Sequence, residues 1–348
     1  MDTAEALRAA AAERILVKDG AFGTEIQARR LATGDYLGAL SLTRDQRGNN
    51  DLLNLTRPAL ITEIVENFAA AGADVLATNS FNATRISQAD YGAEHLVRDI
   101  NVAAARIVRD VAARHQALDG RRRFVAGALG PTNKTLSLSP NVNDPGYREV
   151  DFDEVSDVYV EQIEALVEGG VDIILIETVF DTLNAKAAVH AARSVEARLG
   201  RSLPIMLSMT ITDLSGRNLS GHSIEAFWAS VRHANPLSIG LNCSFGAEQL
   251  RAHIASLSNI ADTLIMAYPN AGLPNELGEY DEGPEQTASQ VEHWAEQGIV
   301  NIVGGCCGTT PAHIAAIAKT VGRYAPRRIP VVPQRMQLAG IEPMTIDA

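Results

Sequence analysis

Residues 299–309 read IVNIVGGCCGT, and this stretch shows how the whole chain is built. A short apolar run ends in two glycines and two adjacent cysteines, and Thr310–Pro311 then supplies a good N-cap and first position for a helix. A near-continuous apolar run of this length is typical of a parallel strand covered on both faces. The stretch therefore predicts a strand, a glycine-rich turn that carries two thiols, and a helix.

The same unit recurs along the chain. Seven more apolar runs precede helical stretches, at 15–20, 74–80, 124–130, 172–178, 204–210, 238–244 and 263–270. The stretch after Pro58 is one example, because Ile61, Ile64, Val65 and Phe68 mark a single helix face. Eight β–α pairs in about 310 residues predict an α/β fold, a single closed (β/α)8 barrel of the TIM type. An open doubly wound sheet built from the same elements is the alternative.

Two segments depart from the repeat. We expect residues 1–324 to form the barrel, including an N-terminal helix and a long polar connection over 25–57. Connections of that length are usually lids or disordered segments. Residues 325–348 carry several prolines and read as an extended strap or linker.

Composition narrows the function classes. The chain has 348 residues, 46% of them hydrophobic, and a formal net charge of −12, so its surface would repel a polyanion such as nucleic acid. No apolar stretch reaches the roughly 18 residues of a membrane span, and the acid-containing N-terminus is unlike a secretory signal. Three cysteines argue against a disulfide framework. We expect a cytoplasmic protein with neither a nucleic-acid nor a membrane partner.

All three cysteines lie where predicted strands end. Cys243 ends the sixth run, and Cys306 and Cys307 end the eighth. The carboxyl ends of barrel strands share one face, so these thiols are expected to meet there. Three thiolates form a soft, anionic ligand set that suits zinc, and a fourth position would stay open, as in catalytic zinc sites. The sequence predicts a metal that binds and activates a substrate.

Other polar residues end strands on the same face. Asp19 and Glu177 follow the first and fourth runs, and together they are candidates to bind the ammonium group of an amino acid. Backbone N–H groups near Gly23 are candidates to bind a carboxylate, with the Thr24 hydroxyl as an added donor.

Two asparagines complete the candidate site. Asn79 follows the second run and is a candidate substrate contact. Asn270 follows the seventh run, and its amide oxygen is a candidate fourth metal ligand before substrate binds, with an ordinary turn role as the alternative.

Nine motifs resemble the homocysteine S-methyltransferase family, and within it the homocysteine-binding module of cobalamin-dependent methionine synthase. They are KDGAFGTEIQ, NLTRPALI, TNSFNAT, GALGPTNKTLS, IETVFDTLNA, GRNLSGHS, GLNCSFG, YPNAGLPN and GGCCGTTPAHI. The similarity covers about residues 14–346, and GxNC with a distant GGCCG is its most specific part. The resemblance implies a zinc barrel in which Cys243, Cys306 and Cys307 hold the metal and Asp19 and Glu177 hold the homocysteine amino group.

The resemblance also implies a methyltransferase that makes methionine, of the methionine synthase type. Zinc would deprotonate homocysteine so that its thiolate attacks a methyl donor. The implied donor is methylcobalamin carried on a separate domain or subunit, because no D-x-H-x-x-G cobalamin motif occurs in this sequence. The chain is expected to be either an excised module or a free-standing subunit of a split enzyme.

Three other functions fit parts of the pattern. A homocysteine methyltransferase could use betaine or S-methylmethionine directly, through the same zinc chemistry. A phosphate-binding barrel would use the GGCCGTT loop at a helix N-terminus, although no Lys or Arg lies near that loop. A scaffold with structural zinc would normally need four protein ligands, and the chain has three cysteines.

Overall fold

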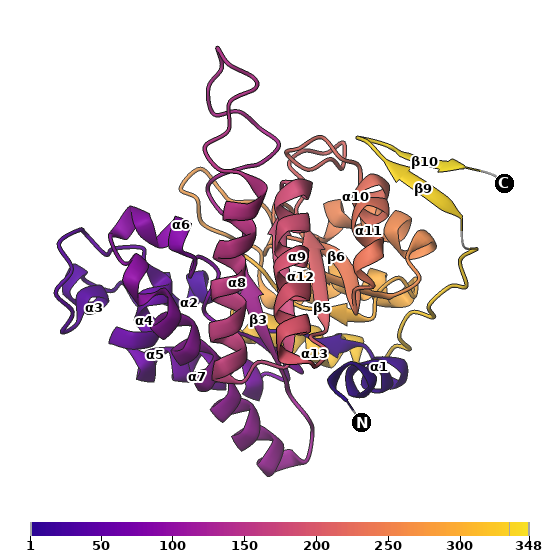
Figure 1. The fold of residues 1–348 in the computed structure, drawn as a ribbon. Helices are drawn as coiled ribbons and strands as arrows, with labels where there is room; N and C mark the ends of the chain where they lie inside the picture. The colour runs from indigo at the N-terminus through magenta and orange to yellow at the C-terminus, as the bar shows by residue number, and fades with distance from the viewer. Residues whose placement is uncertain (1, 334, 347–348) are drawn as a thin grey trace.

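An eight-stranded parallel sheet closes into a barrel in the computed structural model, which describes residues 2–333 and 335–346 (Figure 1). The strands are β1 (Leu16–Val17), β2 (Val75–Ala77), β3 (Phe124–Leu129), β4 (Ile173–Val179), β5 (Ile205–Met209), β6 (Ser238–Asn242), β7 (Leu264–Tyr268) and β8 (Ile302–Val303). Their order is β1-β8-β7-β6-β5-β4-β3-β2. A parallel bridge between Lys18 and Val75 joins β1 to β2 and completes the ring. The predicted (β/α)8 barrel is confirmed.

Helix α1 (Thr3–Glu13) precedes β1, and the helices after it connect successive strands and cover the outside of the barrel (Figure 1). They are α2 (Phe22–Ala28), α3 (Thr33–Leu37), α4 (Leu53–Thr56), α5 (Pro58–Ala70), α6 (Arg85–Gln88), α7 (Val97–Asp119), α8 (Phe152–Gly169), α9 (Thr182–Leu199), α10 (Ile224–Val231), α11 (Ala247–Ile260), α12 (Pro284–Glu296) and α13 (Pro311–Val321). Short 3-10 turns occur at η1 (Asn50–Leu52), η2 (Ala89–Tyr91), η3 (Glu94–Leu96) and η4 (Arg232–Ala234). Within residues 2–333 and 335–346, no helix combines the length and apolar character needed to cross a membrane.

Two apolar cores hold the barrel together. The inner core fills the ring with residues from alternate strand positions, such as Leu16, Leu175 and Met266. Helix α1 belongs to this core, because its Leu7 and Ala11 are buried against the strand residues. The outer core lies between the strands and the surrounding helices. The strands are therefore covered on both faces, as the unbroken apolar runs predict.

The connection over 25–57 contains α3, η1, α4 and most of α2. It packs on the barrel because Leu52 and Leu53 are fully buried. A buried hydrogen bond between side-chain amides, from the Asn49 Nδ2 to the Gln88 Oε1 at 2.9 Å, joins it to the segment that follows β2. Apolar residues inside a mostly polar stretch therefore anchor the segment against the barrel.

The C-terminal segment runs along the barrel and then forms a hairpin of β9 (Met336–Ala339) and β10 (Pro343–Ile346). The hairpin lies beside α10 (Figure 1), and the Ser223 N–H donates to the Ile341 carbonyl at 3.0 Å. Earlier in the segment, the buried guanidinium of Arg327 donates to the carbonyls of Ser258 and Ala261 at the end of α11. A positive charge there is favourable because carbonyl groups at a helix C-terminus carry partial negative charge.

Candidate metal centre

The three cysteines meet at the carboxyl ends of β6 and β8. Their sulfur atoms all lie within 4.8 Å of one another, and the Sγ atoms of Cys243 and Cys307 are 3.7 Å apart. A tetrahedral zinc ion with Zn–S distances of about 2.3 Å holds its sulfur ligands about 3.8 Å apart. The cluster therefore has the donor chemistry of a zinc site, and the Cys243–Cys307 pair has the spacing of two corners of a zinc tetrahedron.

The backbone around these sulfurs is unusual. Cys243 and Ser244 have φ values of +62° and +61°, in the left-handed region that residues other than glycine rarely adopt. Such residues cost about 1–3 kcal/mol each and persist where the surroundings fix them, often at functional sites. Here the Cys243 N–H donates to the Tyr268 carbonyl at 3.2 Å, so β7 holds the turn in place.

The thiols also affect one another. Hydrogen bonds from Cys243 and Cys306 lower the pKa of the Cys307 thiol. Hydrogen bonds with Cys243 and Cys307, together with burial, raise the pKa of the Cys306 thiol. The Cys307 thiol therefore loses its proton more readily than an ordinary thiol and the Cys306 thiol less readily, as expected for neighbouring acids that interact.

Asp19 and Glu177 are both buried, and the Asp19 carbonyl accepts from the Gly305 N–H of the cysteine loop at 3.3 Å. Asp19 has a partner on each oxygen: Oδ1 accepts from the Lys18 Nζ at 2.8 Å, and Oδ2 accepts from the Ala77 N–H at 2.7 Å. Glu177 Oε2 accepts from the Tyr268 hydroxyl at 2.9 Å. Within the described residues, the other oxygen of Glu177 has no hydrogen-bond partner. Glu177 is therefore the carboxylate with an oxygen left to accept a bond from a ligand.

A lysine balances the charge of this carboxylate pair. The Lys18 side chain is 4% exposed, and its Nζ lies 4.6 Å from the centroid of the Tyr268 ring. Burial alone would lower the pKa of Lys18, but the negative charges of Asp19 and Glu177 outweigh it and raise that pKa. Burial raises the pKa of Glu177, while Lys18 and Tyr268 act in the opposite direction. The net charge of these three groups is −1 when all are ionised.

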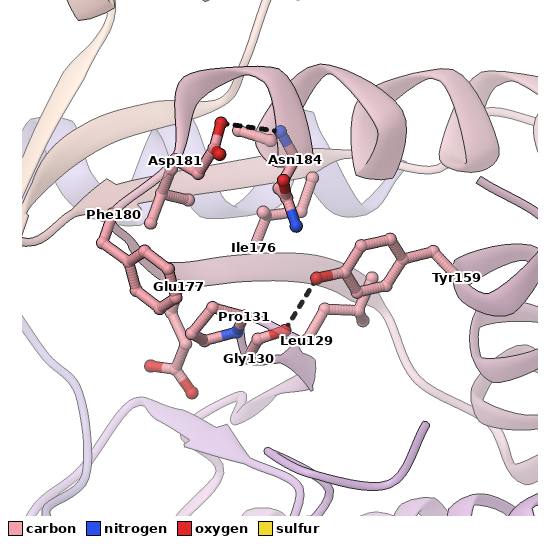
Figure 2. Close-up of a pocket in the computed structure, with 11 residues that line it drawn as sticks. Leu129, Gly130, Pro131, Tyr159, Ile176, Glu177, Phe180, Asp181 and Asn184 are labelled. Atoms are coloured by element: carbon pink, nitrogen blue, oxygen red, sulfur yellow. Dashed lines mark hydrogen bonds between the residues drawn. The ribbon is translucent and has the colours of Figure 1, made fainter. Parts of the chain in front are cut away.

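A small cavity lies on the opposite side of Glu177, between the ends of β3 and β4 and the helices α8 and α9. Figure 2 shows the carboxylate of Glu177 pointing away from Tyr159, whose hydroxyl donates to the Gly130 carbonyl at 3.0 Å. This cavity measures about 10 Å³, which is room for about one water molecule. It is too small for an amino acid, so a ligand of Glu177 must approach from the barrel side.

Thr24 and Asn270, two of the remaining predicted residues, form hydrogen bonds to the loop that carries Cys306 and Cys307. The Thr24 Oγ1 accepts from the Gly308 N–H at 2.9 Å, which joins the start of α2 to the loop after Cys307. The Asn270 Oδ1 accepts from the Cys307 N–H at 3.1 Å, so its amide oxygen is already used within the protein. Gly23 faces open space, since a Cβ there would meet no atom within 4 Å.

Asn79 faces the segment 50–54 instead of the cysteines. Its Nδ2 donates to the Asn50 carbonyl at 2.8 Å, and its carbonyl accepts from the Asn54 Nδ2 at 2.6 Å. These bonds anchor the connection after β1 to the end of β2. The contact between Asn79 and substrate stays a prediction.

Sequence reasoning missed four residues of this site. Lys18 and Tyr268 pair with the two carboxylates, and Asn242 contacts Cys306. Tyr280 hydrogen-bonds to Cys307, and its approach requires Gly308, where a Cβ would lie 2.4 Å from the Cβ of Tyr280. The first three lie at or next to strand ends, so the apolar runs could have predicted their place in the site. Tyr280 lies in the long loop between β7 and α12, where no sequence pattern indicates a site residue.

A protein family and several solved structures resemble this chain. Residues 16–321 match the family model described as homocysteine S-methyltransferase. The fold is similar to that of the homocysteine methyltransferase MmuM from Escherichia coli. For its metallated form, the identity is 22%, the TM-score 0.70, and the alignment covers 90% of this chain and 98% of that chain. For its oxidised form, the identity is 22%, the TM-score 0.68, and the coverage 88% and 95%.

Proposed function

This chain belongs to the homocysteine S-methyltransferase family, and we propose that it methylates homocysteine on a zinc ion held by Cys243, Cys306 and Cys307. The observation that carries the proposal is the triangle of sulfurs, because its spacing fits zinc and the described residues supply no fourth thiol. A bound zinc ion would lower the pKa of the substrate thiol, which is otherwise only a few per cent thiolate at neutral pH. The same free thiols favour the cytoplasm as its compartment.

We propose that the amino group of homocysteine binds beside Glu177. The unpartnered oxygen of Glu177 would accept a charge-assisted hydrogen bond from the ammonium group. Asp19 would add negative potential, although both of its oxygens already accept bonds inside the protein. The remaining charge of −1 on Lys18, Asp19 and Glu177 matches one ammonium. The substrate carboxylate would face the open space at Gly23, with Thr24 nearby.

Methyl transfer then follows from this placement. The sulfur of homocysteine loses its proton to solvent and attacks the methyl group. An S–C bond forms while the bond between the methyl group and its donor breaks, and the electron pair of that bond leaves with the donor. The protein's contribution is to hold the sulfur and the amino group in fixed positions, which removes the entropy cost of aligning them.

We propose methylcobalamin, carried by a separate domain or subunit, as the donor. The motifs named above support this choice. The barrel mouth also has exposed apolar side chains on its loops, including Leu214, Leu273 and Leu277, on which another protein could rest. Betaine and S-methylmethionine are the alternative donors.

Metal and proton measurements test the zinc part of the proposal. The purified protein should contain about one zinc ion per chain, and homocysteine should release about one proton at neutral pH. Cys306→Ser should remove both signals. Retained zinc with full proton release in that variant would contradict the assignment.

The donor is tested by a separate comparison. The protein should make methionine when given methylcobalamin, free or bound to a carrier protein, and should ignore betaine and S-methylmethionine. Turnover with either small donor, at a rate above that with methylcobalamin, would overturn the donor while leaving the zinc chemistry in place.

A further inference from the structure

Asn242, the last residue of β6, connects three strand ends of the candidate metal centre. Its side chain is buried, with 1% exposure. The Oδ1 atom accepts from the Ser208 hydroxyl at 2.6 Å and from the Thr178 N–H at 3.1 Å. The Nδ2 atom donates to the Thr178 Oγ1 at 2.8 Å and to the Cys306 Sγ at 3.8 Å. One amide thus uses both of its hydrogens and both acceptor positions.

The chemistry of the partners fixes the orientation of this amide. The backbone nitrogen of Thr178 can only donate, so the Asn242 atom that it meets must be the oxygen. The amide nitrogen is then necessarily on the side of Cys306. A flipped amide would place two donors against each other, which leaves N–H toward sulfur as the stable arrangement.

Thr178 is the residue that most needs this support. It has a φ of +59°, although its branched side chain disfavours the left-handed region. The pairing of β4 with β5 shifts register between Ile176 and Val179, so one extra residue is inserted here. Ile176 and Val179 both pack in the outer core despite their odd spacing. Leu175 packs in the inner core and Ile176 in the outer core, so strand alternation turns Glu177 inward. The strained turn at Thr178 directly follows this carboxylate, and Asn242 holds the turn through two atoms of Thr178.

We propose that Asn242 is a positioning residue that couples amino-group recognition to the metal centre. Through Thr178 it aims Glu177 at the substrate amino group, and through its N–H it withdraws charge from the Cys306 sulfur. Hydrogen bonds of this kind to metal ligands orient them and tune the metal. The inference rests on the proposed function, because it assigns Glu177 and Cys306 their roles there.

Cobalt substitution separates this role from a merely structural one. Thiolate-to-cobalt charge-transfer absorption reports electron density on the sulfurs, so Asn242→Ala should move that band to lower energy. The affinity of the cobalt protein for homocysteine should fall about tenfold or more. Ser208→Ala is the matched control, because it removes a donor to the same amide but leaves the N–H to sulfur. Its band should stay where the wild-type band is.

A second variant keeps the test decisive if Asn242→Ala folds poorly. Glycine adopts a positive φ without strain, so adding Thr178→Gly should restore the turn and recover much of the homocysteine affinity. The charge-transfer band should remain shifted, because the N–H to Cys306 is still missing. An unshifted band in the double variant would overturn the sulfur contact, and unrecovered homocysteine affinity would overturn the role in the turn. A wild-type protein without any cobalt band would instead count against the proposed function, and the inference would fall with it.

Discussion

Two buried carboxylates at opposite ends of the barrel, Asp74 and Glu177, differ in how many partners they have. At the amino end, Asp74 is fully buried and accepts from Arg14, Arg121 and the Val17 N–H at 2.6–2.9 Å. At the carboxyl end, Glu177 has one partner and a free oxygen, and three sulfurs share one small space. Saturated charges stabilise a fold, whereas unsaturated ones can bind a ligand. The barrel thus separates stability from chemistry along its axis.

The backbone shows the same contrast. Cys243, Ser244 and Thr178 have positive φ values at the carboxyl ends of β6 and β4. At the other end, Arg327 is bound by three carbonyls near the end of α11, and burial lowers its pKa to about 10, so it stays charged at neutral pH. Among the described residues, three of the five non-glycine residues with a positive φ therefore lie beside the proposed chemistry, the other two being Arg30 and Asn235.

Removing a sulfur should have the largest effect on the methyl-transfer rate and little effect on stability. Cys307→Ala is expected to lower the methyl-transfer rate by on the order of a thousandfold or more, because the metal loses a ligand. The midpoint of thermal unfolding, measured on metal-free protein, should change little. A variant that keeps its rate, or that loses as much stability as a change at Asp74, would break the comparison.

Asp51 tests whether unsaturated charge at the carboxyl end lowers stability. Burial raises its pKa to about 7, even though the Asn82 N–H donates to it at 2.9 Å. Between about pH 4 and 7 the unfolded chain loses this proton and the folded protein keeps it, so stability falls as pH rises and levels off above 7. The loss is at most about 4 kcal/mol.

Urea unfolding from pH 5 to 8 measures this effect. Asp51→Asn keeps an acceptor for Asn82 and carries no charge, so its stability should increase relative to wild type as the pH rises. A difference between the two proteins that does not change with pH would contradict the shifted pKa.

At the amino end, Asp74→Ala should cost about 3 kcal/mol of unfolding free energy, because two arginines and a strand N–H lose their partner. The rate per folded molecule should stay near that of wild type. Asp45→Ala is the control, because its pair with Arg47 is exposed and such pairs contribute little to stability. A large loss of turnover in folded Asp74→Ala would show that the two ends are coupled.

Glu177→Gln should give the smallest effect and sharpen the account of the site. Glutamine keeps the size and an acceptor but loses the charge, so the dissociation constant for homocysteine should rise about tenfold while metal content is unchanged. An equal rise for a thiol that lacks the amino group would show that Glu177 does not recognise the amine.

The barrel and the cysteines were predictable because their signals are local and repeat along the chain. Eight unbroken apolar runs specify parallel strands, and topology alone then brings Cys243 to Cys306 and Cys307. The packing of 25–57 was not predictable from local patterns. It depends on the burial of Leu52 and Leu53 and on hydrogen bonds from side-chain amides to a segment about forty residues away. The same holds for Asn242, whose partners lie in or just after three different strands.

The single Lys18–Val75 bridge that completes the ring has a consequence for breathing motions. Two-residue β1 and three-residue β2 share fewer backbone bonds than the long central strands do, although Asp74 and Asp19 each add one side-chain bond across the seam. Local opening here therefore breaks fewer backbone bonds than opening between the central strands. Backbone amides of β1 should accordingly exchange with deuterium through local opening. Amides of β5 and β6 should exchange only through global unfolding. Local opening at β1 would then widen the mouth on one side while the opposite wall keeps its shape.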